Sequence, residues 1–115
     1  MRNADKVFDE WLVLKCQGGD SAALAILVER WQPRLLGFAI RLLGDRDLAE
    51  DAVQSAWLVI VKRIRSLRDP SAIRPWLFRI VANRCADSLR KQIKRRKKER
   101  AAETDHVVDA DEQKQ

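Results

Sequence analysis

Cationic side chains are the residues of this chain best suited to chemistry, and most of them lie in one block. Residues 62–100 contain fifteen Lys or Arg and three Asp or Glu, whereas residues 1–61 contain seven and nine. Such a block can attract the phosphates of nucleic acid, although many charged runs are only solvated surface. The asymmetry predicts a nucleic-acid-facing end and a second surface with a different partner.

The middle of this block has the spacing of a helix with two unlike sides. The stretch RPWLFRIVANRCADSLRKQIKRRKKER, residues 74–100, has an apolar stripe formed by Leu77, Phe78, Val81, Ala82, Cys85, Leu89 and Ile93. Its other side carries cations and one amide, namely Arg79, Asn83, Arg90, Lys94 and Lys97. We expect the front of this helix to pack into a core and the string KRRKKER to project or fray.

A second helix, expected over residues 49–67 after a cap at Asp47, carries an acidic side. Asp47 and Glu50 have the spacing of a capping box, and Ala49, Val53, Ala56 and Ile60 share the face expected to contact the core. Nearly opposite lie Glu50, Asp51, Gln54 and Leu58. The helix dipole accounts for acids in a first turn, but not for the amide and the leucine beside them. A docking site for a basic helix is the other interpretation.

The pattern predicts an all-α fold, a compact bundle of four to five helices. Helices are expected over residues 7–17, 21–30, 33–43 and 49–67, with a last one inside 74–98. Pro33 predicts a break near Trp31 and Gln32. In the first helix, Val7, Trp11 and Leu14 are apolar residues at a helical spacing, and Leu12 can be counted with them. We expect one helical domain over residues 1–98 and a disordered acidic tail, or the start of a linker, over 99–115.

Enzyme and metal chemistry find no support in the sequence. Cys16 and Cys85 stand alone, the one histidine is His106 in the polar tail, and no Gly-rich phosphate loop is present. We therefore expect no enzyme activity, no metal and no cofactor, and two thiols that fill the core in a reducing compartment. No apolar run is long enough to span a bilayer and MRNADK is no signal peptide, which predicts a cytoplasmic protein.

A family resemblance covers about residues 5–98. The segment GDSAALAILVERWQPRLLGFAIRLLGDRDLAEDAVQSAWLVIVKR, followed by RPWLFRIVANRCADSLRK, resembles region 2 of bacterial sigma factors of the extracytoplasmic-function (ECF) type. The matching elements, in order, are Gly19-Asp20 with Ala23, the Leu-Leu-Gly-Asp turn, Ala49-Glu50-Asp51 with Gln54, and Trp76-Leu77 with Arg79-Ile80, Asn83, Asp87 and Arg90.

The resemblance implies two partners. Members of the family bind core RNA polymerase by setting this helix against a coiled coil of the beta-prime subunit, which points to Asp47, Glu50, Asp51, Gln54 and Leu58. The loop that follows helps to hold a base flipped out of the promoter −10 element, and the last helix contacts the single-stranded non-template DNA. The matching positions are Arg65, Arg68, Arg74, Arg79, Asn83 and Arg90, with Lys94 and Lys97 expected on phosphates.

Several alternatives accompany this resemblance. Asp87 matches an acidic family position, where pairing with Arg84 or Arg90 competes with DNA contact, and Trp76 is expected to pack in the core rather than to stack on a base. An anti-sigma factor is a further possible partner. Full ECF factors also carry region 4, which this chain lacks, so we expect a fragment of a longer factor rather than a short factor. The rival functions are a basic nucleic-acid-binding module without polymerase contact, and a protein-interaction domain with a solubilising basic end.

Overall fold

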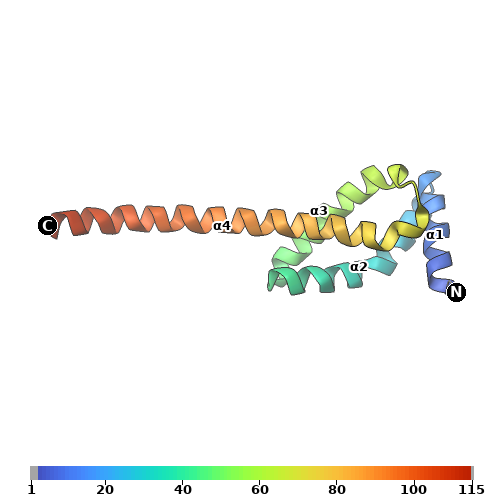
Figure 1. The fold of residues 1–115 in the computed structure, drawn as a ribbon, viewed down its shortest axis with the longest axis horizontal. Coiled ribbons are helices and arrows are strands. Elements are labelled where there is room, and N and C mark those ends of the chain that lie inside the picture. Colours follow the sequence, from blue (N-terminus) through green and yellow to red (C-terminus); the bar gives the residue numbers. More distant parts are fainter. Residues whose placement is uncertain (1–2, 115) are drawn as a thin grey trace. The chain divides into compact units, whose positions relative to one another are not determined.

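The computed structural model describes residues 3–114, with side chains for residues 3–103, and within these residues it is all-helical. Its four α-helices are α1 (Ala4–Gln17), α2 (Ser21–Leu43), α3 (Arg46–Arg63) and α4 (Ile73–Lys114), shown in Figure 1. Two short 3-10 helices, η1 (Ile64–Ser66) and η2 (Pro70–Ala72), connect α3 to α4. The predicted all-α fold is confirmed.

The chain divides into two compact units, Met1–Cys85 and Ala86–Gln115. The first contains α1, α2, α3, both 3-10 helices and the beginning of α4, and the second is the rest of α4. The backbone of this second unit is helical to Lys114. The predicted disordered tail is therefore not confirmed, and the side chains from residue 104 onward lie outside the described residues.

Three polar side chains fix where α1, α2 and α3 begin. Asn3 accepts a hydrogen bond from the Lys6 amide at 2.9 Å, Asp20 from the Ala23 amide at 3.1 Å, and Asp45 from the Leu48 amide at 3.0 Å. Each satisfies one of the amide groups that a helix start leaves without a partner.

The predicted cap of α3 is wrong. Gly44 adopts a left-handed conformation, with φ of 67°, that ends α2, and Asp45 follows in extended conformation as the cap. The helix therefore begins at Arg46, and Asp47 lies in its first turn, where its carboxylate favours the helix dipole.

The break predicted near Trp31 and Gln32 is also wrong, because α2 continues through Pro33. A proline inside a helix costs about 3 kcal/mol through the lost hydrogen bond and a steric clash. On either side of it, however, Leu27, Trp31, Leu35 and Ala39 are all buried at helical spacing. Each large side chain contributes about 1.5–3 kcal/mol when buried, which outweighs the cost of the proline.

Of the four apolar residues that indicate the helical spacing of α1, Leu12 alone is buried. Val7, Trp11 and Leu14 are exposed, and the buried residues are Asp9, Leu12, Val13 and Cys16. Asp9 makes this face look polar in sequence, but its carboxylate is satisfied inside the structure. It accepts hydrogen bonds from Arg30 Nε at 3.0 Å and from the Trp31 indole at 3.2 Å. A partnered carboxylate can be buried where an unpaired one could not.

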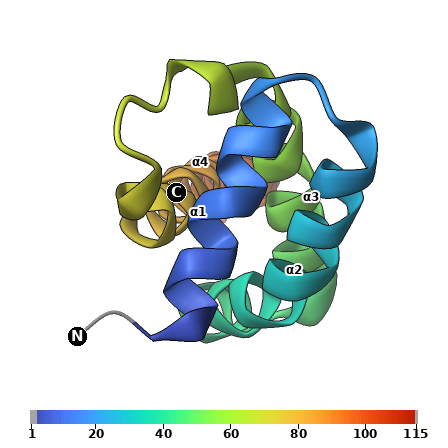
Figure 2. The same ribbon diagram turned by 90° about the vertical axis from the view of Figure 1, so that its right-hand side faces the viewer.

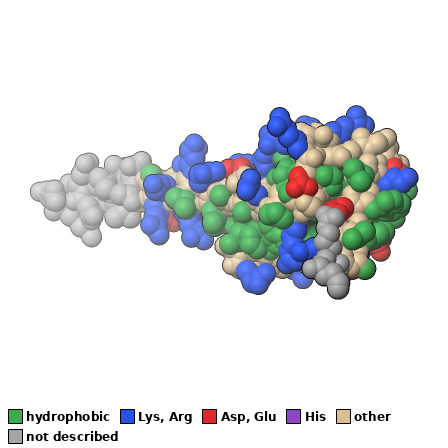
Figure 3. All heavy atoms as spheres, turned by 45° about the vertical axis from the view of Figure 1, so that its right-hand side comes forward, with side chains coloured by type: hydrophobic (Ala, Val, Ile, Leu, Met, Phe, Trp, Pro, Cys, Tyr) green, Lys and Arg blue, Asp and Glu red, His purple; other side chains and the backbone are tan. Residues whose placement is uncertain are grey.

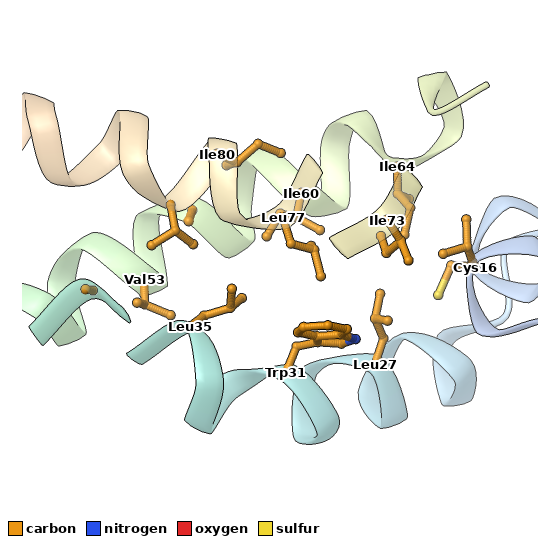
Figure 4. Close-up of a cluster of buried hydrophobic side chains, with 14 of the residues drawn as sticks. Cys16, Leu27, Trp31, Leu35, Val53, Ile60, Ile64, Ile73, Leu77 and Ile80 are labelled. Atoms are coloured by element: carbon orange, nitrogen blue, oxygen red, sulfur yellow. The ribbon is translucent and has the colours of Figure 1, made fainter. Parts of the chain in front are cut away.

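The core of the first unit lies where α1, α2, α3 and the start of α4 meet (Figures 2 and 4). The predicted core residues of α3, Ala49, Val53, Ala56 and Ile60, are fully buried, as are Leu77, Val81 and Cys85 of α4. The prediction that both cysteines fill the core is confirmed. Burial raises the pKa of both thiols, and for Cys16 the nearby Asp20 carboxylate adds to the effect, so both remain protonated at neutral pH.

Candidate functional site

The residues predicted to bind polymerase all lie exposed on α3 and form what we call the α3 face: Asp47, Glu50, Asp51, Gln54 and Leu58. The core residues Val53, Ala56 and Ile60 occupy the opposite side of the same helix. Leu58 exposes 66% of its surface, the largest exposed fraction among the large hydrophobic side chains of the described residues. The face therefore combines negative charge, an amide and an apolar group without any role in the core.

The acids of the α3 face differ in whether they form ion pairs. Glu50 Oε1 accepts a hydrogen bond from Arg46 Nε at 2.9 Å, an ion pair across one helical turn that was not predicted from the sequence. Asp47 and Asp51 form no ion pair within the described part of the chain. The field of the α3 face thus comes mainly from these two aspartates, with Glu50 partly neutralised.

Val61 extends the α3 face at its apolar end and was also missed. It lies three residues after Leu58, on the same side of the helix, and exposes 47% of its surface. The sequence held the signal, because Leu58 and Val61 have the spacing of one helical stripe.

The loop between α3 and α4 presents two exposed arginines, Arg65 and Arg68. Local hydrogen bonds order it: Ser66 Oγ donates to the Arg63 carbonyl at 2.6 Å, and Asp69 accepts from the amide and the hydroxyl of Ser71 at 3.0 and 2.6 Å. Ile64 and Ile73 are buried at its two ends (Figure 4). The arginines are thus carried by a folded loop rather than by a loose connection.

The beginning of α4 presents Arg74, Arg79 and Asn83 to solvent, while Leu77 and Val81 lie in the core. We call Arg65, Arg68, Arg74, Arg79 and Asn83 together the recognition surface. The side-chain amide of Asn83 makes no hydrogen bond to the described part of the chain, so its donor and acceptor are available. Trp76 packs against the core, as expected, and is only partly exposed.

A pocket of about 270 Å³ lies beside this loop, between the start of α1, the middle of α2 and the start of α4. Its lining includes Trp31, Arg34, Ser71 and Arg74, while Asn83 lies outside it. Of the recognition surface, Arg74 is the residue that lines this hollow. The rest of the surface lies on open parts of the loop and helix.

The second unit carries the remaining predicted DNA-binding residues. Arg90 forms an ion pair with Asp87, one of the two arrangements foreseen for that acid, whereas Lys94 and Lys97 are exposed. Figure 3 shows Lys and Arg side chains crowding the described part of this unit. A helix with this density of positive charge is suited to contact phosphates without reading sequence.

The described residues form neither a cluster of metal ligands nor a membrane-spanning helix. No group of His, Cys, Asp or Glu side chains in that part of the chain could hold a metal ion. None of the described helices is both long and apolar enough to cross a membrane.

Comparison with known families identifies the fold. Residues 27–95 match the model of Sigma-70 region 2, which is more than half of the chain. The chain belongs to this family. It is a family of transcription initiation factors and not of enzymes, which confirms that part of the sequence prediction. All of α3, the loop and the start of α4 lie inside the matched Sigma-70 region 2 segment.

Curated relatives agree with the Sigma-70 region 2 assignment. The chain is 33% identical over 81 residues to the RNA polymerase sigma-H factor of Pseudomonas aeruginosa, covering 70% of this chain and 42% of that protein. It is 34% identical over 92 residues to the ECF RNA polymerase sigma-E factor of Haemophilus influenzae, covering 80% and 48%. The ECF RNA polymerase sigma-E factor of Escherichia coli K12 is 32% identical over 80 residues, covering 70% and 41%.

The chain spans less than half the length of these curated relatives. No solved structure matches it significantly.

Proposed function

We propose that this chain is the region 2 part of an ECF sigma factor, which docks on core RNA polymerase through the α3 face and binds the promoter −10 element through the recognition surface. The observation that carries the proposal is the exposed α3 face, where Leu58 is two-thirds exposed and Asp47 and Asp51 have no ion pair within residues 3–103. Its membership of the Sigma-70 region 2 family and its sigma-factor relatives support the same function.

Docking on polymerase uses charge and apolar contact together. Asp47 and Asp51 would attract a basic partner helix, here the coiled coil of the beta-prime subunit, and the exposed Leu58 and Val61 would lose water on contact. Acids give speed and specificity to association, whereas a buried leucine adds about 1.5–3 kcal/mol of binding free energy. A face with both properties suits a stable protein complex better than it suits nucleic acid.

Strand recognition belongs to the other surface. Arg65, Arg68 and Arg79 are exposed cations that can hold the phosphates of the non-template strand. Lys94 and Lys97, on the second unit, are exposed cations that can also bind phosphates. Asn83 offers a donor and an acceptor to a base edge, which can distinguish one base from another. A surface that binds splayed bases better than duplex shifts the equilibrium towards the open strand, and in this way helps to melt the promoter.

Binding of the purified chain to core RNA polymerase tests the proposal, together with binding to labelled single strands of −10 type. If the proposal holds, the amount of chain bound to the polymerase reaches a plateau as the concentration of the chain rises. A chain that binds single strands but no polymerase would instead be a basic nucleic-acid-binding module, and one that binds neither would be a protein-interaction domain. Under the proposal the protein acts in the bacterial cytoplasm, and an anti-sigma factor would bind the same faces.

A further inference from the structure

The loop between α3 and α4 is hydrogen-bonded to Gln17, the last residue of α1. Gln17 Nε2 donates a hydrogen bond to the carbonyl of Ile64 at 3.0 Å and another to the carbonyl of Leu67 at 2.8 Å. These two carbonyls bracket the η1 turn, since Ile64 begins it and Leu67 follows its last residue. A side-chain amide has two N–H hydrogens, and here both are used on one loop.

The turn after Gln17 also accommodates one of the loop arginines. Gly19 has a φ of 89°, a conformation that favours glycine, and a Cβ placed there would lie 3.6 Å from a guanidinium nitrogen of Arg65. The Arg65 side chain therefore lies against the turn between α1 and α2. The same short segment of the chain contacts both the backbone of the loop and one of its cations.

Bonds within the loop leave part of its backbone unsupported. The Leu67 amide donates to the Ile64 carbonyl at 3.2 Å, and the Ala72 amide donates to the Asp69 carbonyl at 2.9 Å. The Leu67 carbonyl takes part in none of these local bonds. It belongs to the peptide group that joins Leu67 to Arg68. The Gln17 amide supports the backbone at the point where η1 ends and the exposed stretch begins.

From these contacts we infer that Gln17 is a positioning residue for strand recognition. It contacts no DNA itself, but fixes the backbone that presents Arg65 and Arg68, so the loop is ordered before the strand arrives. Ordering a loop in advance removes an entropic cost from binding, and it keeps the contacts on defined atoms. This inference rests on the proposed recognition of the −10 element, and it adds the end of α1 to the apparatus that performs it.

The test compares Gln17→Met, which keeps the length of the side chain and removes both donors, with a matched control. Gln32→Met makes the same change at a glutamine whose Oε1 accepts a hydrogen bond from the Trp57 indole at 2.6 Å and so joins α2 to α3 away from the loop. Each protein, as the full chain, is titrated with labelled single strands of −10 type that differ at one base, and its melting temperature is measured. Gln17→Asn, which keeps the amide but shortens its reach, guards against a variant that does not fold.

Gln17→Met is expected to lower the ratio of affinities between preferred and changed strands by roughly three- to tenfold, the effect of losing two hydrogen bonds that order the loop. Gln17→Asn gives a smaller loss, and Gln32→Met lowers the melting temperature while it keeps the wild-type ratio. An unchanged ratio in both Gln17 variants, or an even loss on all strands that Gln32→Met reproduces, overturns the inference alone. A wild-type chain that binds all strands equally overturns the proposed −10 recognition, and the role of Gln17 with it.

Discussion

The α3 face and the recognition surface differ in what holds their side chains in position. The α3 face lies on one regular helix whose other side packs in the core. The helical backbone therefore sets the position of every residue of the face. The recognition surface begins on a loop of two 3-10 turns and ends on the first part of α4, and the loop depends on contacts from α1. A helical face tolerates change at one position, whereas a folded loop is vulnerable to changes made far away in sequence.

Charge separates the two surfaces as clearly as geometry does. The α3 face carries Asp47 and Asp51 without ion pairs among the described residues, and the recognition surface carries four arginines and one amide. One polyanionic partner could not use both surfaces. The difference therefore argues for two partners, and each of the following changes should affect one surface and spare the other.

The largest effect is expected from reversing a charge on the α3 face. Asp51→Arg places a like charge against a basic partner helix and should weaken binding to core polymerase by about 3 kcal/mol, because juxtaposed like charges cost that much at an interface. Glu29→Arg, at an exposed acid of α2, is the control with the same change in net charge. Competition binding measures both, and equal affinity of Asp51→Arg and wild type would show that the α3 face does not dock.

Asn83→Ala should affect the strand instead of the polymerase. Loss of the amide removes a donor and an acceptor, so discrimination among strands that differ at one base should fall by about 1–3 kcal/mol. Affinity for unrelated strands should change little, since no charge is lost. Titrations of labelled strands, each with a melting curve, measure this, and an even loss on all strands with a lowered melting temperature would assign Asn83 a structural role.

The contrast between the two surfaces also explains what the sequence could predict. The exposure of Asp51, Gln54 and Leu58 was predicted, because helical spacing alone separates them from the buried Val53 and Ile60. Nothing local in the sequence links Gln17 to Leu67, fifty residues away, so the support of the loop appeared only in the structure. The same holds for the face of α1, because the burial of Asp9 depends on Arg30 and Trp31 of another helix.

Other errors came from competing local signals. Pro33 predicts a break by its own chemistry, and only the burial of Trp31 and Leu35 on either side keeps α2 intact. Asp45 and Asp47 are both acceptable caps, and the left-handed Gly44 decides for the first. Val61 could have been found, since it continues the spacing of Leu58.

Leu58→Ala tests the apolar part of the α3 face. Its side chain is mostly exposed, so the melting temperature should stay unchanged, whereas burial against a partner predicts a loss of about 1–1.5 kcal/mol in binding to core polymerase. Leu42→Ala, at an exposed leucine of α2, is the matched truncation. If both variants lose affinity equally in an equilibrium binding assay, Leu58 has no particular place in the interface.

The smallest effect is expected from the second unit. Replacing Lys94 and Lys97 by Gln should reduce the slope of log affinity against log salt for single strands by about 1.4, since each phosphate that is no longer neutralised lowers it by about 0.7. The ratio between preferred and changed strands should stay at its wild-type value. Titrations at several salt concentrations measure both quantities, and a fall in the ratio would give these lysines a part in reading the base.

The separation of the two surfaces is tested most directly by measuring Asp51→Arg and Asn83→Ala side by side, each against core RNA polymerase and against the preferred single strand. Two independent surfaces predict that Asp51→Arg loses polymerase and keeps the discrimination among strands. They predict equally that Asn83→Ala keeps polymerase and loses that discrimination. If either variant lost both activities while its melting temperature stayed at the wild-type value, the two partners would share one surface and the account would be wrong.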